Sequence, residues 1–478
     1  MNKKIIFHTL GWVLLIEAIC MIMPLICAMV YRETEALSFA YTILGTAIIG
    51  FTLTKLPIKT KSMYAKEGLI IVALSWIVMS LAGSVPFVIS GYIPSFTDAL
   101  FETVSGFTTT GASILTNVEA LPKSLLFWRS FTHWIGGMGV LVFLLAILPI
   151  SGANNMHLMR AESPGPTVSK LVPRIKSTAK ILYAIYSVMT ITEIIFLLLG
   201  GMSPFEAIIH ALGTAGTGGF GIKNNSIEGY SPYLQNVITV FMLLFGINFS
   251  LYYLMLTKHF KEAIKSSELR TYLGLFAVAS IFICINILPQ ANSISEALRL
   301  SCFQVASVMT TTGYSTCNFD LWPTFSKTIL VILMFIGASA GSTGGGIKVS
   351  RIIVVVKSIG KELKTMIHPK SVRKLTVDGH AVEHETVRGI NVFLAAYACI
   401  FVISLLIIAL DNQSFTTSFT AVTSAINNIG PGLDAVGPAA NFSILSPLSK
   451  LVMIFDMLAG RLEIFPILIL FSSFTYKK

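Results

Sequence analysis

Four short segments of the chain share one pattern, in which a glycine follows a Thr or an Asn by two residues. The glycines are Gly111, Gly219, Gly313 and Gly430; the residues directly before them are Thr110, Gly218, Thr312 and Ile429; those two before them are Thr109, Thr217, Thr311 and Asn428. Glycine adopts backbone angles that can aim successive carbonyl oxygens toward one side, and a Thr hydroxyl can bond a neighbouring group or an ion. Such a set of carbonyls suits a dehydrated cation.

Each of these glycines ends an amphiphilic stretch of about 12 residues, too short to cross a bilayer, which takes about 20. The stretches begin at Ala99, Ala207, Ser301 and Ser418. We predict that each stretch is a re-entrant pore helix followed by a turn inside the membrane. Non-helical backbone at that depth is tolerated only where it is buried in protein or lines a water-filled cavity. Four such turns around one axis form a ring suited to potassium, which sheds its water more readily than sodium or a divalent ion does.

Apolar segments long enough to span a bilayer surround these stretches. They lie near residues 8–30, 37–54, 67–90, 124–150, 180–201, 233–257, 270–289, 324–357, 388–410 and 447–473. Only 12% of the residues are charged, against about 25% in an ordinary soluble domain. We therefore predict an all-α polytopic membrane protein with four pseudo-repeats of span, re-entrant pore helix, filter loop and span around one pore. The repeats are expected at residues 57–165, 166–265, 266–372 and 373–478, after an N-terminal two-span hairpin at residues 1–56.

The basic residues fall mainly in alternate loops, and the richest group runs from Lys348 to Arg388. The positive-inside rule assigns these loops to the cytoplasm, and ten spans then place both termini there. The net charge of +11 is explained by topology, so we expect no nucleic-acid partner. The basic loop 358–387 is a natural docking face for a cytoplasmic partner and for anionic lipid headgroups.

The span at residues 324–357 is interrupted by a glycine-rich run at residues 337–346. A phosphate-binding loop does not fit, because Ile347 occupies the position that needs a Lys. We interpret the run as a flexible plug under the carbonyl ring; the alternative is a break that serves only packing.

Several of these motifs together resemble the Trk/Ktr potassium-uptake family, closest to the membrane subunit of the TrkH type. They are residues 101–112 (FETVSGFTTTGA), 127–139 (FWRSFTHWIGGMG), 341–351 (GSTGGGIKVSR) and 460–464 (GRLEI). The resemblance covers nearly the whole chain. It implies potassium uptake across the bacterial cytoplasmic membrane, through a single-chain pore that usually forms a homodimer. It also implies a cytoplasmic, TrkA-like nucleotide-binding ring as regulatory partner, membrane lipids as surroundings, and K⁺ as the transported ion with no organic cofactor.

The resemblance also suggests which residues form the gate. These are Gly341, Ser342, Thr343, Gly344, Gly345, Gly346 and Arg461. It places Arg461 below the filter, where its charge opposes cation occupancy; the residues alone equally allow Arg461 to pair with a carbonyl or with Asp456. The fourth loop lacks Thr, and no loop contains the long Thr-Val-Gly-Tyr-Gly filter of true potassium channels. We therefore expect weaker discrimination among potassium, rubidium and sodium.

A few polar residues within apolar segments need separate interpretation. His133 and Trp134 are interpreted as packing residues, and Glu102 as a support for the first pore helix. Glu193 is either paired or part of a proton relay.

Three other classes of function compete with ion uptake. A cation-coupled transporter of a small solute also uses broken helices, but at paired positions in inverted halves. A membrane enzyme needs a catalytic or metal-binding cluster, and the sequence contains none. A structural or receptor subunit has no need for four re-entrant loops.

Overall fold

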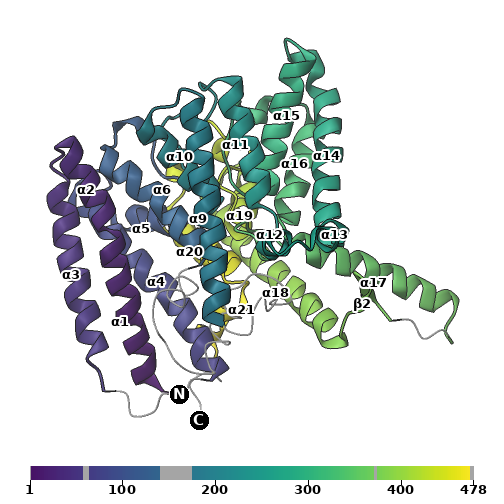
Figure 1. The fold of residues 1–478 in the computed structure, drawn as a ribbon, viewed down its shortest axis with the longest axis horizontal. Helices are drawn as coiled ribbons and strands as arrows, with labels where there is room; N and C mark the ends of the chain where they lie inside the picture. The colour runs from purple at the N-terminus through teal and green to yellow at the C-terminus, as the bar shows by residue number, and fades with distance from the viewer. Residues whose placement is uncertain (1, 58–63, 140–174, 371–373, 474–478) are drawn as a thin grey trace.

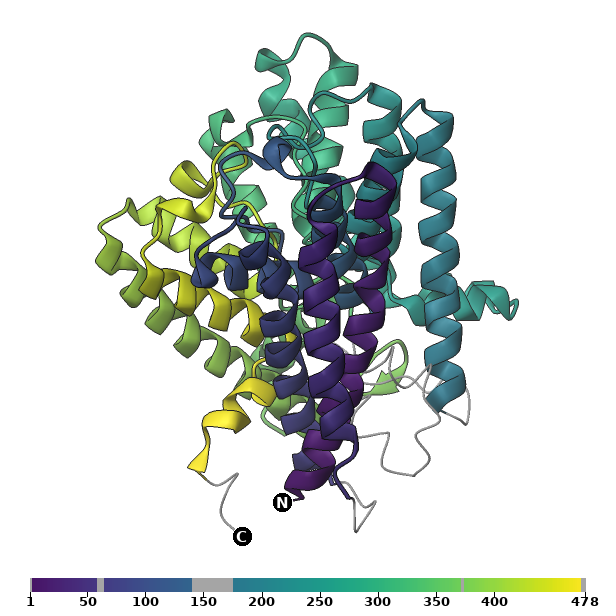
Figure 2. The ribbon, with the colours of Figure 1, turned by 90° about the vertical axis from the view of Figure 1, so that its left-hand side faces the viewer.

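The computed structural model describes residues 2–57, 64–139, 175–370 and 374–473. Within these ranges the regular secondary structure is helical apart from one antiparallel hairpin, in which β1 (Thr376–Val377) pairs with β2 (His380–Ala381). The long helices stand side by side, and the first and last helices, α1 (Lys3–Cys20) and α21 (Phe465–Phe471), approach the same end of the bundle (Figures 1 and 2). This all-α architecture confirms the predicted fold class.

The N-terminal hairpin lies at one edge of the bundle. Helices α1 and α2 (Ile22–Tyr31) together form one span, which runs antiparallel to α3 (Ala36–Thr54) (Figure 1). The two spans cross at Gly11 and Gly50, where a Cβ on Gly11 would lie 2.7 Å from the carbonyl oxygen of Gly50. Small residues allow membrane helices to approach this closely.

Four consecutive segments share one order of elements: a long helix of 21–25 residues, a helix of 12–16 residues that we call the short helix, a loop, and a helix of 13–15 residues that starts the second span and that we call the second long helix. They are α4 (Ala65–Ile89), α5 (Phe96–Phe107) and α6 (Lys123–Gly137); α9 (Ile175–Leu199), α10 (Pro204–Gly216) and α11 (Pro232–Phe245); α14 (Ser267–Ile287), α15 (Ile294–Met309) and α16 (Thr324–Ile336); and α18 (His384–Ile408), α19 (Phe415–Asn427) and α20 (Pro447–Arg461). The other helical pieces are α12 (Phe249–Leu256), α13 (Phe260–Lys265), α17 (Val349–Ile367), η1 (Val118–Ala120), η2 (Leu288–Gln290), η3 (Phe319–Leu321), η4 (Ala409–Asp411), η5 (Asp434–Val436) and η6 (Phe442–Ile444).

The four short helices pack in cyclic order. Each contacts the second long helix of the preceding repeat: α10 lies on α6, α15 on α11, and α19 on α16. The short helix of the first repeat, α5, lies on α20 of the fourth. The last contact joins the two ends of the series, so the four repeats close around one axis.

All four short helices begin in the same way. Their N-caps are Ser95, Ser203, Ser293 and Ser414, and each serine side chain accepts a hydrogen bond from the backbone amide three residues later. Such a cap satisfies an amide that the helix leaves unpaired and stabilises the helix by about 1 kcal/mol. The fourfold repeat of this cap fixes where each short helix starts.

The second long helix of the repeats is interrupted, which corrects two of the predicted spans. The predicted span 233–257 is not straight, because α11 and α12 are bent by 89° at residues 246–248. The predicted span 447–473 divides into α20 and α21, with positive φ at Glu463 and Ile464 (53° and 70°) between them. Helix α6 ends at Gly137, and the remainder of the predicted span 124–150, from residue 140, lies outside the described residues.

The third repeat is interrupted where the sequence predicts it. Helix α16 ends at Ile336, and α17 starts at Val349 after the glycine-rich run. Helix α17 does not continue the direction of α16, and it extends away from the bundle (Figure 1). The apolar segment predicted to end at residue 357 therefore includes nine residues, 349–357, that belong to α17 and not to the span.

Candidate functional site

The four filter loops have the same backbone conformation. The residues two before the glycines, Thr109, Thr217, Thr311 and Asn428, have φ between 55° and 59°, and the glycines Gly111, Gly219, Gly313 and Gly430 have φ between 74° and 102°. A left-handed conformation is uncommon for Thr, yet all three threonines adopt it and all four of these residues are completely buried. Each loop thus has a positive φ at two of three consecutive residues, which is how a short loop turns neighbouring carbonyls toward one side.

The glycines bring the four loops into a closed ring. A Cβ built on Gly111 would lie 2.0 Å from the carbonyl oxygen of Gly218, and one on Gly219 would lie 2.0 Å from the carbonyl oxygen of Thr312. A Cβ on Gly313 would lie 2.2 Å from the carbonyl oxygen of Ile429. A Cβ on Gly430 would lie 2.9 Å from the carbonyl oxygen of Thr110. Each glycine therefore faces the carbonyl of the next loop, and the fourth faces the first. The structure brings together all eight residues that the sequence proposes for ion coordination.

A polar cavity of about 150 Å³ lies on one side of this ring. All four filter glycines line it, together with polar side chains from the loops that follow them: Ser113, Asn224, Ser226, Ser315 and Asn441. The ring is therefore in contact with a space that suits water and a hydrated ion.

Hydroxyl and amide groups hold the loops in register. The Thr108 and Thr110 hydroxyls lie 2.8 Å apart, and the same distance separates the hydroxyls of Thr310 and Thr312 in the third loop. In the fourth loop, the Asn428 amide donates to the Thr110 hydroxyl at 3.0 Å and to the Met457 carbonyl at 2.9 Å. The Asn that departs from the Thr pattern thus joins the fourth loop to the first.

The start of the fourth short helix is also joined to the loop that follows its filter. The Asp434 carboxylate accepts hydrogen bonds from Ser414 and, at 2.9 Å, from the Thr417 hydroxyl. These two hydrogen bonds lower the pKa of Asp434, because they favour its charged form.

A buried ion pair links the first two loops. Arg129 and Glu102 are 2.7 Å apart with almost no exposed surface. Glu102 also accepts hydrogen bonds from the Ser113 hydroxyl and the Ile114 amide, and Arg129 donates to the Gly221 carbonyl at 3.3 Å. Glu102 lies where a support for the first pore helix is expected. Its partner Arg129 was missed by the sequence analysis, although an Arg within an apolar segment is itself a signal.

His133 lies between the first short helix and the second filter loop. Its Nδ1 is 2.7 Å from the Gly106 carbonyl, and its Nε2 accepts a hydrogen bond from the Phe220 amide at 3.4 Å. The ring is completely buried and packs on Phe220. His133 therefore does more than fill space, because its two nitrogens bond two different repeats. The neighbouring Trp134 stacks on Tyr186, as a packing residue does.

The glycine-rich run lies directly under the ring. The Gly345 amide donates to the Thr311 hydroxyl at 2.6 Å, the Gly346 amide to the Asn427 carbonyl at 3.1 Å, and the Thr343 hydroxyl to the Phe245 carbonyl at 3.3 Å. A Cβ on Gly344 would lie 2.7 Å from the Thr310 carbonyl oxygen. Ser342 stabilises the loop internally, by donating to the Ser339 carbonyl. We call residues 337–348 the gate loop.

Arg461 connects the gate loop to the first repeat. Its guanidinium donates to the Thr343 carbonyl at 2.8 Å and to the Gly137 carbonyl at 2.7 Å. Asp456, the alternative partner, instead accepts a hydrogen bond from Ser404. Arg461 thus pairs with carbonyls, as one of the interpretations allowed, and its role in opposing cation occupancy stays a prediction.

Two further cations lie near the gate loop. Lys348 is buried and donates to the Gly344 carbonyl, and Arg351 forms an ion pair of 2.5 Å with Glu463. From the sequence, Lys348 and Arg351 were assigned to the basic loops and to the motif at residues 341–351, but not to contacts of the glycine-rich run.

Glu193 lies elsewhere, on the long helix α9. It is completely buried and faces Thr214 of α10.

Comparison with known proteins gives one consistent result. The profile of the family described as TrkH, cation transport protein, matches residues 32–476. The Trk system potassium uptake protein TrkH of Escherichia coli (strain K12) is 37% identical over 99% of both chains, and that of Halomonas elongata is 33% identical over the full length of both.

The fold agrees with a solved structure of the same type. The crystal structure of the potassium transporter TrkH from Vibrio parahaemolyticus matches with a TM-score of 0.90 and 33% identity, and covers 100% of each chain. These matches confirm the family resemblance and the expectation of a transporter rather than an enzyme. The chain belongs to the TrkH family of cation transport proteins.

Proposed function

We propose that this protein takes up potassium ions across the membrane through the ring formed by its four filter loops. The observation that carries the proposal is the closed series of glycine-to-carbonyl approaches, which leaves no room for a side chain at any of the four positions. The ion-coordinating groups are the carbonyls of Thr110, Gly111, Gly218, Gly219, Thr312, Gly313, Ile429 and Gly430. Relatives that are 37% identical are named as potassium uptake proteins.

Ring carbonyls replace the hydration shell of the ion, and Thr109, Thr217, Thr311 and Asn428 hold the backbone that presents them. The driving force is the membrane potential, which contributes about 2.3 kcal/mol per charge for each 100 mV. Since each loop supplies one matched glycine, the ring offers few stacked carbonyl sites. We therefore expect rubidium to pass and sodium to be rejected incompletely.

The gate loop blocks the path below the ring in this conformation. Its amides bond Thr311 and Asn427, and Arg461 holds it to α6. Opening requires these contacts to break together, and the positive charge of Arg461 opposes a resident cation until then.

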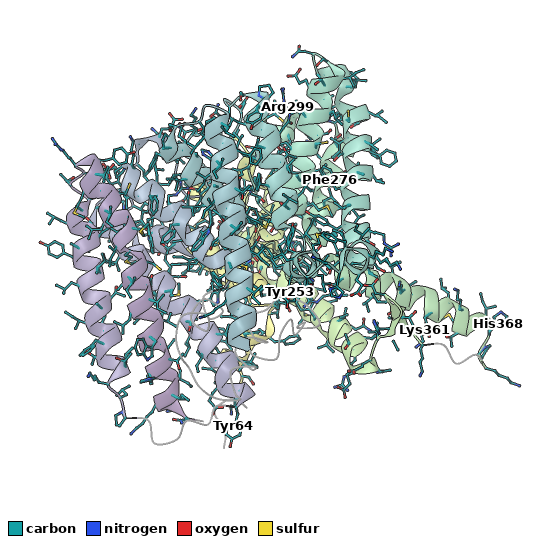
Figure 3. The ribbon with its side chains drawn as sticks, viewed as in Figure 1. Tyr64, Tyr253, Phe276, Arg299, Lys361 and His368 are labelled. Carbon is teal, nitrogen blue, oxygen red and sulfur yellow. The ribbon has the colours of Figure 1, made fainter. Side chains whose placement is uncertain are left out.

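The gate loop continues into α17, which offers a surface for a regulatory partner. Helix α17 extends from the bundle, with Lys361 on its outer part and His368 directly after its end (Figure 3). A groove of about 700 Å³ lies between α17, the β hairpin and α18, and Lys361, Glu362, Lys374 and His384 are among its lining residues. We propose that a cytoplasmic nucleotide-binding ring docks here and moves the gate loop through α17.

We further propose that the protein works as a homodimer in the bacterial cytoplasmic membrane, with both termini in the cytoplasm. Tyr64 and Arg299 lie at opposite ends of the molecule (Figure 3). The lysine-rich loops belong to the Tyr64 end by their place in the alternation along the chain, and the positive-inside rule puts that end in the cytoplasm.

Uptake of rubidium-86 into proteoliposomes tests the potassium pathway. The purified wild type is compared with Gly313→Ser, with potassium and sodium as competitors. The control is Gly274→Ser, because a Cβ on Gly274 meets nothing within 4 Å. Two results together support the ring: potassium inhibits rubidium uptake by the wild type, and Gly313→Ser, but not Gly274→Ser, loses uptake or loses its preference for potassium over sodium. An unchanged preference for potassium over sodium in Gly313→Ser contradicts the ring. Stimulation of flux by a small organic solute would favour the alternative, a cation-coupled solute transporter.

A further inference from the structure

An apolar groove of about 980 Å³ runs along the surface between α9 and α11 and ends on α12 and α13. Ala184 and Val188 line it from α9, Val240 and Leu244 from α11, and Phe260 from α13. Val188, Val240 and Phe260 each keep about half or more of their surface exposed. Since α9 has the length and hydropathy of a membrane span, the groove opens toward lipid.

The dimensions of the groove match half of a bilayer. Its lining on α9 extends from Ala184 to Phe196, which at 1.5 Å per residue is about 18 Å, against a hydrocarbon core about 30 Å thick. The length and the apolar lining of the groove suit a lipid acyl chain.

One end of the groove carries positive charge from two separate elements. Lys180 lies one turn before Ala184 on the same face of α9, and Lys258 and Lys261 flank the lining residues Leu256 and Phe260. All three lysines are exposed, and none forms an ion pair within the described ranges. An anionic headgroup at this end gains about 1 kcal/mol from each nearby lysine.

The groove is also built over the bend that contacts the gate loop. The lining residue Tyr252 donates its hydroxyl across the bend to the Leu244 carbonyl at 2.6 Å. From the same bend, the Gly246 carbonyl accepts from the Ser339 amide at 3.1 Å, and the Phe249 amide donates to the Gly341 carbonyl at 3.0 Å. Figure 2 shows the α12–α13 pair extending sideways from the bundle near α9, and Figure 3 labels Tyr253 on α12.

We propose that this groove binds an anionic phospholipid, with its acyl chain along α9 and α11 and its phosphate at the lysines, and that the bound lipid holds the α11–α12 bend and thereby the gate loop. The proposal of lipid binding depends only on the groove, whereas the proposed effect of the lipid on ion flux rests on the proposed potassium pathway.

Lipid binding is tested first, without ion transport. Native mass spectrometry counts the phosphatidylglycerol and phosphatidylcholine retained by the wild type, by the triple variant Lys180→Gln, Lys258→Gln, Lys261→Gln, and by a charge-matched control. The control is Lys3→Gln, Lys4→Gln, Lys55→Gln, which removes three exposed lysines from the N-terminal hairpin. Each groove lysine removed should weaken phosphatidylglycerol binding about fivefold. Equal retention by the triple variant and the control would overturn the proposal.

A second variant tests the apolar part of the groove. Val240→Trp fills the groove, and Ile48→Trp places the same side chain on α3, where Ile48 is 57% exposed. Val240→Trp alone should displace the lipid. If it changes the oligomeric state and leaves lipid retention unchanged, the groove is a contact between copies and the proposal is wrong.

Flux is measured last, in phosphatidylcholine liposomes with and without phosphatidylglycerol. The wild type should respond to phosphatidylglycerol, and the triple lysine variant should not. A wild type that binds phosphatidylglycerol but transports equally without it would refute the link to the gate. A wild type with no uptake under any condition would count against the potassium pathway, while the retention data would still decide lipid binding.

Discussion

The backbone amide of Gly345 donates a hydrogen bond of 2.6 Å to the side-chain hydroxyl of Thr311. Gly345 belongs to the gate loop and Thr311 to the third filter loop, so one bond joins the gate to the filter. A net hydrogen bond contributes about 1 kcal/mol, which corresponds to about a fivefold change in an opening equilibrium.

We predict that Thr311→Val raises basal rubidium uptake about fivefold, because Val keeps the shape of Thr but cannot accept the Gly345 amide. The matched control is Thr109→Val. Thr109 has the same left-handed conformation and full burial, but its hydroxyl has no hydrogen-bond partner among the described residues. Uptake assays on both variants check the prediction, and an equal increase in both would show that filter strain, not the gate, is responsible.

Arg461 provides a second test of the gate. Arg461→Gln removes the positive charge and the guanidinium group, whose two sides donate to the carbonyls of Thr343 and Gly137. We therefore expect a larger rise in basal uptake than for Thr311→Val. Arg461→Lys keeps the charge but cannot reproduce the fork. An uptake near that of the wild type in Arg461→Lys would show that the charge alone restrains flux; an uptake near that of Arg461→Gln would assign the restraint to the bonds.

The sequence predicted the parts of this molecule that repeat. The four glycines, the small residues twelve positions earlier and the flanking apolar segments were enough to predict the short helices and the ring, whereas the family was recognised from the motifs at residues 101–112, 127–139, 341–351 and 460–464. The gate run was also recognisable, because its glycines interrupt an apolar segment.

The sequence did not predict the breaks in the second and fourth repeats. Hydropathy is a property of a window of residues, and it stays high where apolar residues continue on both sides of a bend, as at Gly246. Contacts between repeats could not be predicted from local patterns either, because the partners are far apart in sequence. Asn428 and Thr110, for example, are 318 positions apart. The ion pair of Glu102 and Arg129 depends on how α5 packs on α6, which no local pattern determines.

That ion pair makes a strong prediction for stability. Arg129→Met alone leaves the buried Glu102 carboxylate without its cation, and breaking a buried pair in this way costs about 3–5 kcal/mol. The double variant Glu102→Gln, Arg129→Met removes both charges and should recover much of the loss. Thermal unfolding in detergent checks this expectation. If the double variant is no more stable than Arg129→Met, the contacts of Arg129 with Gly221 and Phe220 outweigh the ion pair.

His133 is predicted to set selectivity through the second filter loop. His133→Leu keeps apolar bulk but leaves the buried Phe220 amide without its partner, which costs about 1–3 kcal/mol. The Gly106 carbonyl also loses its bond to His133 and keeps only that from the Thr109 amide. The second loop should loosen, so sodium should compete more strongly with rubidium while uptake itself persists. His133→Gln can keep one of the two bonds and should fall between His133→Leu and the wild type. Competition curves of sodium against rubidium uptake for the three proteins check this order. A loss of stability without any change in sodium competition would show that His133 serves only packing.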